Sequence, residues 1–175
     1  GAVAYYFTVK SKAGNIPGQS ILNTVKLKNK PGELETDETL QLKEMIGKFH
    51  KAYHYERLGQ TYLDKKQYDL AIPQFKKAIQ RDSESNEARY GLGKALHAMG
   101  NYSEAAEALG ELVKIDKKYD YGNAIFGQAE CYRLGGLEDK ALKTYEEVIN
   151  SFHFFKALYH YANLLDQKGQ KDEAI

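Results

Sequence analysis

The chain has 175 residues, of which 42% are hydrophobic and 28% charged, and its formal net charge is +1. This composition excludes a disordered chain of low hydrophobicity. A single cysteine, Cys131, excludes an internal disulfide framework. No run of residues approaches the roughly 18 consecutive apolar positions of a membrane-spanning helix. The composition is that of an ordinary soluble protein.

Charge is distributed unevenly along the chain. Residues 1–32 contain five lysines and no acidic residue, which is +5 and leaves −4 for the remainder. An acidic main body argues against nucleic acid as the principal ligand, because phosphate binding requires concentrated Lys and Arg. Five lysines on an arm could still attract an anionic membrane surface, although on charge alone a solvated basic tail is the better explanation of them.

Residues 1–35 predict a basic, partly extended linker, because glycines and prolines interrupt most of this segment. The segment opens with apolar and aromatic residues followed by Lys10 and Lys12, as the end of a membrane helix would be. A β-strand or a solvated tail explains the same residues, so these alternatives stay open for residues 1–12. The expected location is the bacterial cytoplasm, either free or attached to the inner face of the membrane by a tether before residue 1.

From residue 36 the apolar residues recur at helical spacing, and residues 36–51 predict a capping helix. Beyond this helix the sequence repeats itself, because Leu58-Gly59 returns 34 residues later as Leu92-Gly93. Later copies are anchored on Ala129 and Ala162. The expected boundaries are 52–85, 86–119 and 120–154 for three full repeats and 155–175 for a partial fourth.

Each copy predicts two amphipathic helices joined by a short turn, and in the fourth copy Gly169 marks the turn. We expect the paired helices to cross at the small anchors, which are Gly59, Gly93, Ala129 and Ala162. The second helices would supply the facing small surface from Ala71, Ala105, Ala141 and Ala174. Bulky residues between these positions would fill the space between helices, which accounts for much of the aromatic excess.

This repeat pattern resembles the tetratricopeptide repeat family over residues 52–175. The resemblance implies an all-α fold, a right-handed superhelix of stacked antiparallel helix pairs in which the first helix of each pair lines a concave groove for partners. The chain departs from the family pattern where a proline usually follows the second helix, because Ser83, Lys117 and His153 stand there. Two extra residues around positions 117–121 predict a longer corner before the third repeat.

Helical spacing predicts which side chains face this groove. They are Tyr53, Glu56, Arg57, Gln60 and Asp64 in the first repeat, Glu87, Tyr90, Lys94 and His97 in the second, Asn123, Phe126, Glu130 and Arg133 in the third, and Lys156, Tyr159, His160 and Asn163 in the fourth. Tyr90, Phe126 and Tyr159 occupy equivalent positions, and Gln60, Lys94, Glu130 and Asn163 form a second equivalent row. An aromatic row beside a polar row suits an extended or helical peptide. The alternative is that the same rings pack laterally between first helices.

The sequence therefore predicts a non-enzymatic interaction scaffold whose partner is a protein or peptide, without cofactor, metal or nucleic acid. The resemblance implies that chaperone-binding relatives clamp a C-terminal carboxylate with Lys, Asn and Arg side chains, but Glu56, Gln60 and Gly91 occupy the matching positions here. We therefore expect no binding of such chaperone tails. A self-assembling module, through end-to-end stacking or through the N-terminal segment in a neighbour's groove, is the alternative. RNA binding is a distant third.

Catalytic and metal-binding chemistry finds little support in the sequence. His50 and His54 have the spacing of two metal ligands on one helix, but no third ligand accompanies them at fixed spacing. Cys131 is expected to be a buried, inert residue. Glutamates such as Glu104, Glu107, Glu146 and Glu147 predict a solvated helix face.

Overall fold

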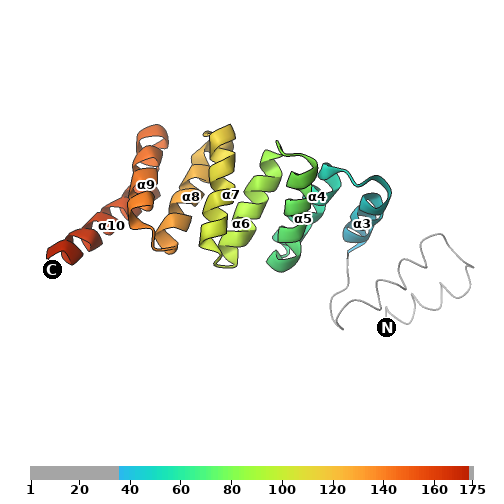
Figure 1. Cartoon of the computed structure of the whole chain (residues 1–175), viewed down its shortest axis with the longest axis horizontal. Helices are drawn as coiled ribbons and strands as arrows, with labels where there is room; N and C mark the ends of the chain where they lie inside the picture. Colours follow the sequence, from blue (N-terminus) through green and yellow to red (C-terminus); the bar gives the residue numbers. More distant parts are fainter. Residues whose placement is uncertain (1–35, 174–175) are drawn as a thin grey trace, which may run out of the picture. The chain divides into compact units, whose positions relative to one another are not determined.

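The computed structural model describes residues 36–173, with side chains through residue 169 (Figure 1). The predictions made for residues 1–35 and for Ala174 lie outside the described residues. Between residues 36 and 173, all regular structure is helical, and the helices follow one another in chain order from α3 to α10.

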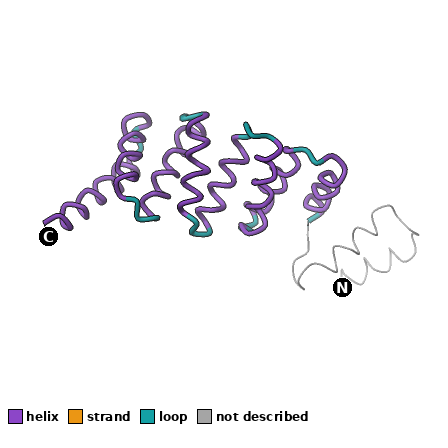
Figure 2. The backbone as a smooth tube through the Cα atoms, in the orientation of Figure 1, coloured by secondary structure: helices purple, strands orange, loops and turns teal. Residues whose placement is uncertain are grey.

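The described chain is a stack of antiparallel helix pairs. Helix α3 (Asp37–Phe49) precedes three pairs, which are α4 (Ala52–Asp64) with α5 (Tyr68–Arg81), α6 (Asn86–Ala98) with α7 (Tyr102–Ile115), and α8 (Asn123–Leu134) with α9 (Glu138–Phe152). A short 3₁₀ helix, η1 (Tyr119–Gly122), leads into α8, and α10 (Phe155–Glu173) follows α9. The connections between these helices are short (Figure 2). The all-α stack of helix pairs predicted from the sequence is confirmed.

The turn inside each pair uses one left-handed residue. Lys66, Gly100 and Gly136 have φ values of 59°, 80° and 75° at equivalent positions. The next residue's amide then bonds back to the first helix, as Asn101 N does to the carbonyl of Leu96 at 2.9 Å. This is the hydrogen bond of a Schellman motif, which satisfies carbonyl groups that the helix end leaves free. The repeat in sequence therefore includes the turn chemistry as well as the helices.

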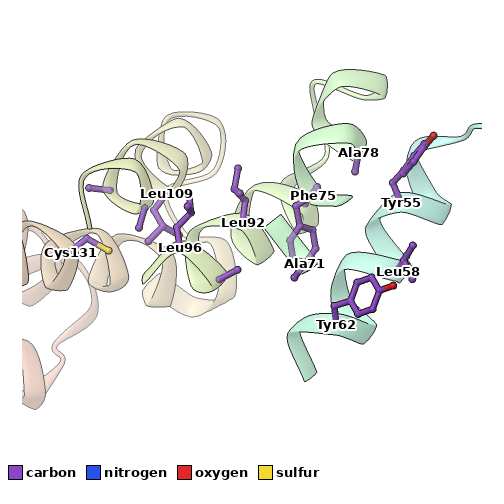
Figure 3. Packing of buried hydrophobic residues seen from close by; sticks show 14 residues of the cluster. Tyr55, Leu58, Tyr62, Ala71, Phe75, Ala78, Leu92, Leu96, Leu109 and Cys131 are labelled. Atoms are coloured by element: carbon purple, nitrogen blue, oxygen red, sulfur yellow. The ribbon is translucent and has the colours of Figure 1, made fainter. Parts of the chain in front are cut away.

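The hydrophobic core runs along the stack between first and second helices (Figure 3). The side chains of Phe75 in α5 and Tyr145 in α9 are fully buried, and Leu58 in α4 and Leu96 in α6 are each 2% exposed. A second cluster continues the core through α8, α9 and α10. Each pair thus buries its apolar residues against its neighbours only, as in other repeat proteins.

Close approach of the helices requires small residues at the crossings. A Cβ atom added to Gly59 would lie 2.9 Å from the ring of Phe75, and one added to Gly93 would lie 2.6 Å from Leu109. Ala129 in α8 has no exposed surface. These three anchors confirm the predicted crossings in the three full pairs.

The fourth repeat differs from its prediction. Helix α10 continues through Gly169, so the turn expected there is absent from the described residues, and Ala162 is exposed rather than buried. Its neighbours Leu158 and Leu165 are 48% and 45% exposed. Without a second helix against this side of α10, nothing within residues 36–173 covers Ala162 or reverses the chain at Gly169.

The corner between the second and third pairs contains η1. Asp120 and Tyr121 both have left-handed backbone conformations, with φ values of 50° and 55°. Asp116 holds the start of the corner, because its side chain accepts a hydrogen bond from the amide of Lys118 at 2.9 Å. The longer corner predicted from the sequence is therefore a compact, left-handed turn.

In the portion from residue 36 to residue 173, no helix is both long enough and apolar enough to cross a membrane.

The packing at Gly93 leads to a stability prediction. Gly93→Ala should destabilise the chain by about 1–3 kcal/mol because its new methyl group would overlap the buried side chain of Leu109. Gly47→Ala is the matched control, since a Cβ at Gly47 meets nothing within 4 Å. It should stabilise α3 by roughly 0.5–1 kcal/mol through helix propensity. Chemical denaturation measures both, and equal effects of the two substitutions would contradict the close crossing.

Candidate functional site

The first helices α4, α6 and α8 lie along one side of the stack. Helix α4 contacts α6 and α6 contacts α8, whereas α5, α7 and α9 approach one another less. A stack that is more closely packed along one side curves toward that side, so the first helices are on its inner side. We call the non-core surface of α4, α6, α8 and α10 the inner face.

The predicted site residues all lie outside the core. Tyr53, Arg57, Asp64, Glu87, Lys94, Asn123, Lys156, Tyr159 and Asn163 are exposed, and Glu56, Gln60, Tyr90, His97, Phe126, Glu130, Arg133 and His160 are half-buried. The core residues alternate with them at helical spacing on the same helices, as Leu58 and Tyr62 do on α4. Each first helix thus has one stripe in the core and another on the inner face.

At the α4 end of the inner face, polar side chains are engaged locally. Arg57 Nη2 donates to Glu38 Oε1 at 3.1 Å, and Gln60 Nε2 donates to Asp64 Oδ1 at 2.6 Å. These side chains surround a shallow cavity of about 220 Å³, lined by Glu38, Arg57, Gln60, Thr61, Asp64 and Lys65. The cavity is small for an organic ligand, because typical ligand pockets enclose about 300–1,000 Å³.

Glu56 connects α4 to the start of α6. Ser85 Oγ donates to Glu56 Oε2 at 2.8 Å and accepts from the amide of Ala88 at 3.1 Å. The second bond caps the N-terminus of α6. Ser85 therefore fixes both the helix start and the carboxylate of Glu56.

The centre of the inner face is built around Tyr90. Its hydroxyl donates to Asp120 Oδ2 at 2.8 Å, and its ring meets Tyr119 edge to face at a centroid distance of 5.2 Å. Lys94 Nζ lies 4.5 Å from the centroid of the same ring. Burial, the hydrogen bond to Asp120 and nearby negative charge raise the pKa of Tyr90, so this phenol stays protonated at neutral pH.

A network of polar side chains joins α8, α9 and α10. Arg133 Nη2 donates to Glu130 Oε2 at 2.8 Å, and Arg133 Nε donates to the hydroxyl of Tyr145 at 3.1 Å. The Tyr145 hydroxyl in turn donates to Glu130 Oε1. His160 Nε2 of α10 lies 3.8 Å from the same oxygen. The carboxylate of Glu130 is therefore occupied by contacts inside the protein.

The environment of Glu130 shifts the pKa values of the network. Burial alone would raise the pKa of Glu130, but the hydrogen bonds from Arg133 and Tyr145 and the charge of Arg133 lower it below its usual value. Burial and the bond to Glu130 raise the pKa of Tyr145. At neutral pH the network therefore pairs a carboxylate with a guanidinium and a neutral phenol.

The side chains of the predicted aromatic row and polar row occupy equivalent positions on successive first helices, but their surroundings differ. Phe126 is half-buried beside Tyr145 and Phe154, at centroid distances of 6.3 and 5.9 Å, whereas Tyr159 is 63% exposed. Tyr90 is half-buried by the corner. In the polar row, Lys94 and Asn163 are exposed, while Glu130 belongs to the network. Tyr90 and Phe126 are thus partly buried, as in the alternative, but against η1 and against α9 and Phe154 rather than between first helices. Tyr159 is the exposed ring of the row.

Several contributors to this face were not predicted. Tyr119 and Asp120 lie in the corner that the sequence marked only as longer, and Ser85 and Tyr145 act from outside the first helices. Two extra residues signalled the corner. Only the spacing of Glu130 and Arg133, three apart on one helix, signalled any part of the network.

The residues considered for catalysis or metal binding do not form a centre. Between residues 36 and 173, no group of three or more His, Cys, Asp or Glu side chains could hold a metal ion. Cys131 is 1% exposed, and burial together with the charge of Glu130 raises the pKa of its thiol to about 12. The prediction that Cys131 is buried is confirmed. Glu104, Glu107, Glu146 and Glu147 are exposed, as expected.

Stacked helix pairs with small residues at each crossing and an exposed inner stripe define the class of α-solenoid repeat proteins. Family models of the tetratricopeptide repeat match residues 62–125 and 123–152. The chain belongs to the tetratricopeptide repeat family.

Several known proteins resemble this chain in sequence or in fold. Superkiller complex protein 3 of Mus musculus is 30% identical over 117 residues, which cover 63% of this chain and 7% of that protein. The crystal structure of MamA superposes with a TM-score of 0.68 and 28% identity, covering 76% of this chain and 78% of MamA. The first repeat domain of Spaghetti (RPAP3), bound to the HSP90 peptide SRMEEVD, has a TM-score of 0.58 and 18% identity, covering 69% and 97%. The chain thus matches only a small part of its curated relative's length.

The lowered pKa of Glu130 leads to a pH prediction. At pH 7, Glu130→Gln should destabilise the chain by about 1–3 kcal/mol, because it removes the charged acceptor of Arg133 and Tyr145. In the folded chain the pKa of Glu130 lies below its usual value of 4.5. The stability that the Glu130 carboxylate contributes is therefore fully present above pH 4.5 and is lost as the pH falls through the pKa of the folded state.

Urea denaturation at pH 7 and at pH 3 measures the difference in unfolding free energy between the native chain and the Glu130→Gln variant. Glu107→Gln, on the exposed face of α7, is the control and should change stability little at either pH. A difference between native and Glu130→Gln chains that stays constant down to pH 3 would contradict the network.

Proposed function

We propose that this chain is a non-enzymatic interaction scaffold that binds a peptide segment of a partner protein on its inner face. The observation that carries this proposal is the separation of two stripes on each first helix. One stripe forms the core, and the other presents rings, amides and charged groups outside it. Rings can bury side chains of a peptide, while polar groups hydrogen-bond to its backbone.

Other features support the binding function over catalysis. The one cysteine is buried and protonated, and the half-buried carboxylate of Glu130 is already bonded to Arg133 and Tyr145. The family supports the same conclusion, because tetratricopeptide repeat proteins generally serve as scaffolds. The one cavity described above is small and lined by polar groups of α3 and α4.

The chaperone type of C-terminal peptide does not fit the proposed site. A Cβ atom added to Gly91 would lie within 3 Å of ring atoms of Phe75, so no side chain at this position could reach a peptide. Glu56, which occupies another of the matching positions, would repel a terminal carboxylate. The HSP90 peptide that the RPAP3 domain binds is therefore a suitable negative probe for this chain.

Selection from a display library of random peptides tests the proposal. Peptides enriched on the full chain should bind with a Kd on the order of micromolar. Lys94→Ala, Asn123→Ala and Asn163→Ala together should weaken binding by about tenfold or more, because they truncate exposed side chains on three first helices. Fluorescence anisotropy measures the affinities.

The matched control removes one lysine and two amides from second helices, as Gln80→Ala, Lys143→Ala and Asn150→Ala. Its affinity should stay within about twofold of the native value, since these residues lie away from the inner face. If no peptide is enriched, or if both triple variants lose affinity equally, the inner face is not the binding site.

Self-assembly is the second candidate function, and the exposed side of α10 favours it. Phe155 and Tyr159 are 87% and 63% exposed, and Leu158, Ala162 and Leu165 are exposed along the same helix. If this side stacks on another copy, light scattering of the full chain should show a mass that rises with concentration. The double substitution Leu158→Asp with Leu165→Asp should keep the chain monomeric, because it places charge in the contact between the two copies. A mass equal to one chain at every concentration would eliminate this candidate.

A further inference from the structure

Helix α10 has two apolar stripes, and only one of them is covered. It is the last helix of the stack (Figure 1). Ala157 and Leu164 are buried in the core cluster that α10 shares with α8 and α9. Phe155, Leu158 and Leu165 are exposed on another side of the same helix. The second stripe is thus apolar without being part of the core.

The uncovered stripe corresponds to core positions of the preceding repeat. Leu158 and Ala162 each lie 33 residues after a residue of α8, Ile125 and Ala129, and both of those are buried. Helix α8 is packed between two second helices, α7 and α9, whereas α10 packs against α9. The uncovered stripe therefore continues the helix–helix core of the stack, and an exposed apolar surface of this kind marks an interaction site.

The residues of this stripe have the spacing of a seam between two helices. Phe155, Leu158, Ala162, Leu165 and Gly169 follow one another at intervals of three, four, three and four residues. This alternation is the a and d pattern of a coiled coil, in which two helices pack along one line of apolar residues. All five positions are exposed, and none of them is charged. We call these five residues the α10 seam.

The α10 seam is complementary to a second copy of itself. Let two copies of the helix run antiparallel, with Ala162 of each copy at a twofold axis. Leu158 of one copy then lies beside Leu165 of the other, and each Phe155 lies beside a Gly169. Small residues at the axis allow the helices to approach closely, as Gly93 does inside the stack. A twofold contact is closed, so the assembly stops at two chains.

The α3 end of the stack matches the α10 seam less well. Helix α3 exposes the apolar side chains of Met45 and Phe49. Its exposed surface also contains five charged residues, which are Asp37, Glu38, Lys43, Glu44 and Lys48. Covering charged groups with an apolar seam costs free energy, because these groups lose their hydration. Pairing of two α10 seams therefore fits the residues better than end-to-end stacking of α10 on α3.

We propose that two copies of this chain associate through their α10 seams as an antiparallel, twofold dimer. The proposal rests on the second candidate function given above, self-assembly, and specifies its partner surface and its symmetry. Helices α4, α6 and α8 lie outside this contact, so each copy keeps that part of its inner face for a peptide. A dimer with two such faces binds a partner that carries two copies of the peptide more tightly than one chain does.

Cysteine cross-linking tests the position of the twofold axis. Ala162→Cys places one thiol of each copy at the axis, where two Cβ atoms can come within the roughly 4 Å that a disulfide requires. After mild oxidation with oxidised glutathione, most of this variant should run as a disulfide-linked dimer on a non-reducing gel. Ala162 is exposed, so the substitution leaves the core unchanged.

Asn163→Cys is the matched control for cross-linking. Asn163 is exposed on the same helix, but it lies about 100° around the helix axis from Ala162. This variant should remain a single chain under the same oxidation. The native chain should also remain uncrosslinked, because its one cysteine, Cys131, is 1% exposed.

Light scattering tests the contact in solution. The mass of the native chain should rise with concentration to that of two chains and then stay constant. Phe155→Asp should restore the mass of one chain, because it places a charge in the apolar contact. Phe155 is 87% exposed, so this substitution spares the core. Met45→Asp with Phe49→Asp on α3 is the control, and it should leave the mass of two chains unchanged.

The outcomes separate this proposal from self-assembly in general and from peptide binding. A mass that rises beyond two chains, or association that is lost in the α3 variant, indicates end-to-end stacking and overturns the α10 dimer. Equal cross-linking at positions 162 and 163 also overturns it. A mass of one chain at every concentration eliminates both the dimer and the self-assembly candidate. Peptide binding on the inner face is measured separately by anisotropy and stands or fails by that measurement.

Discussion

The close crossing of a small residue on a first helix and a large one on the paired helix determines the rest of this structure. Within the pairs, Gly59 lies against the ring of Phe75 and Gly93 lies against Leu109, while Gly91 of the next pair meets the same Phe75 ring. These contacts leave no room for a Cβ atom, so they fix the rotation of each first helix about its axis. Once one stripe of a helix is fixed in the core, the other stripe must face outward. The inner face is therefore a consequence of the core packing.

The corner before α8 shows how a small change in the repeat alters this face. Its chain passes through left-handed residues at Asp120 and Tyr121 and then through Gly122 with a φ of 92°. A Cβ at Gly122 would lie 2.6 Å from the ring of Phe152, so the glycine serves both the turn and the packing against α9. The corner returns Tyr119 and Asp120 to Tyr90 of α6. A local departure from the repeat thus adds side chains that the helices alone would not provide.

The sequence predicted the helices and crossings well because each repeat is a local unit with a strong small-and-large pattern. Gly59 and Gly93 had the expected role, and Cys131 was buried as expected. The prediction for the fourth copy was wrong for a physical reason, because Ala162 is buried only when a second helix packs against it. The side-chain contacts of the candidate site were less predictable. Glu130 and Arg133 share a helix, but Tyr145 reaches them from another one, and helical spacing carries no information on such contacts.

The electrostatics of the inner face depend on its individual charged groups rather than on the net charge of the chain. Glu130 and Arg133 are paired with each other, so they contribute little field to a ligand. The carboxylates of Glu56, Glu87 and Asp120 have no cation within ion-pair distance among residues 36–173. At physiological salt, screening limits the reach of an exposed charge to about 8 Å. The field just outside the inner face is therefore set by the nearest unpaired groups, and the formal net charge of +1 says little about it.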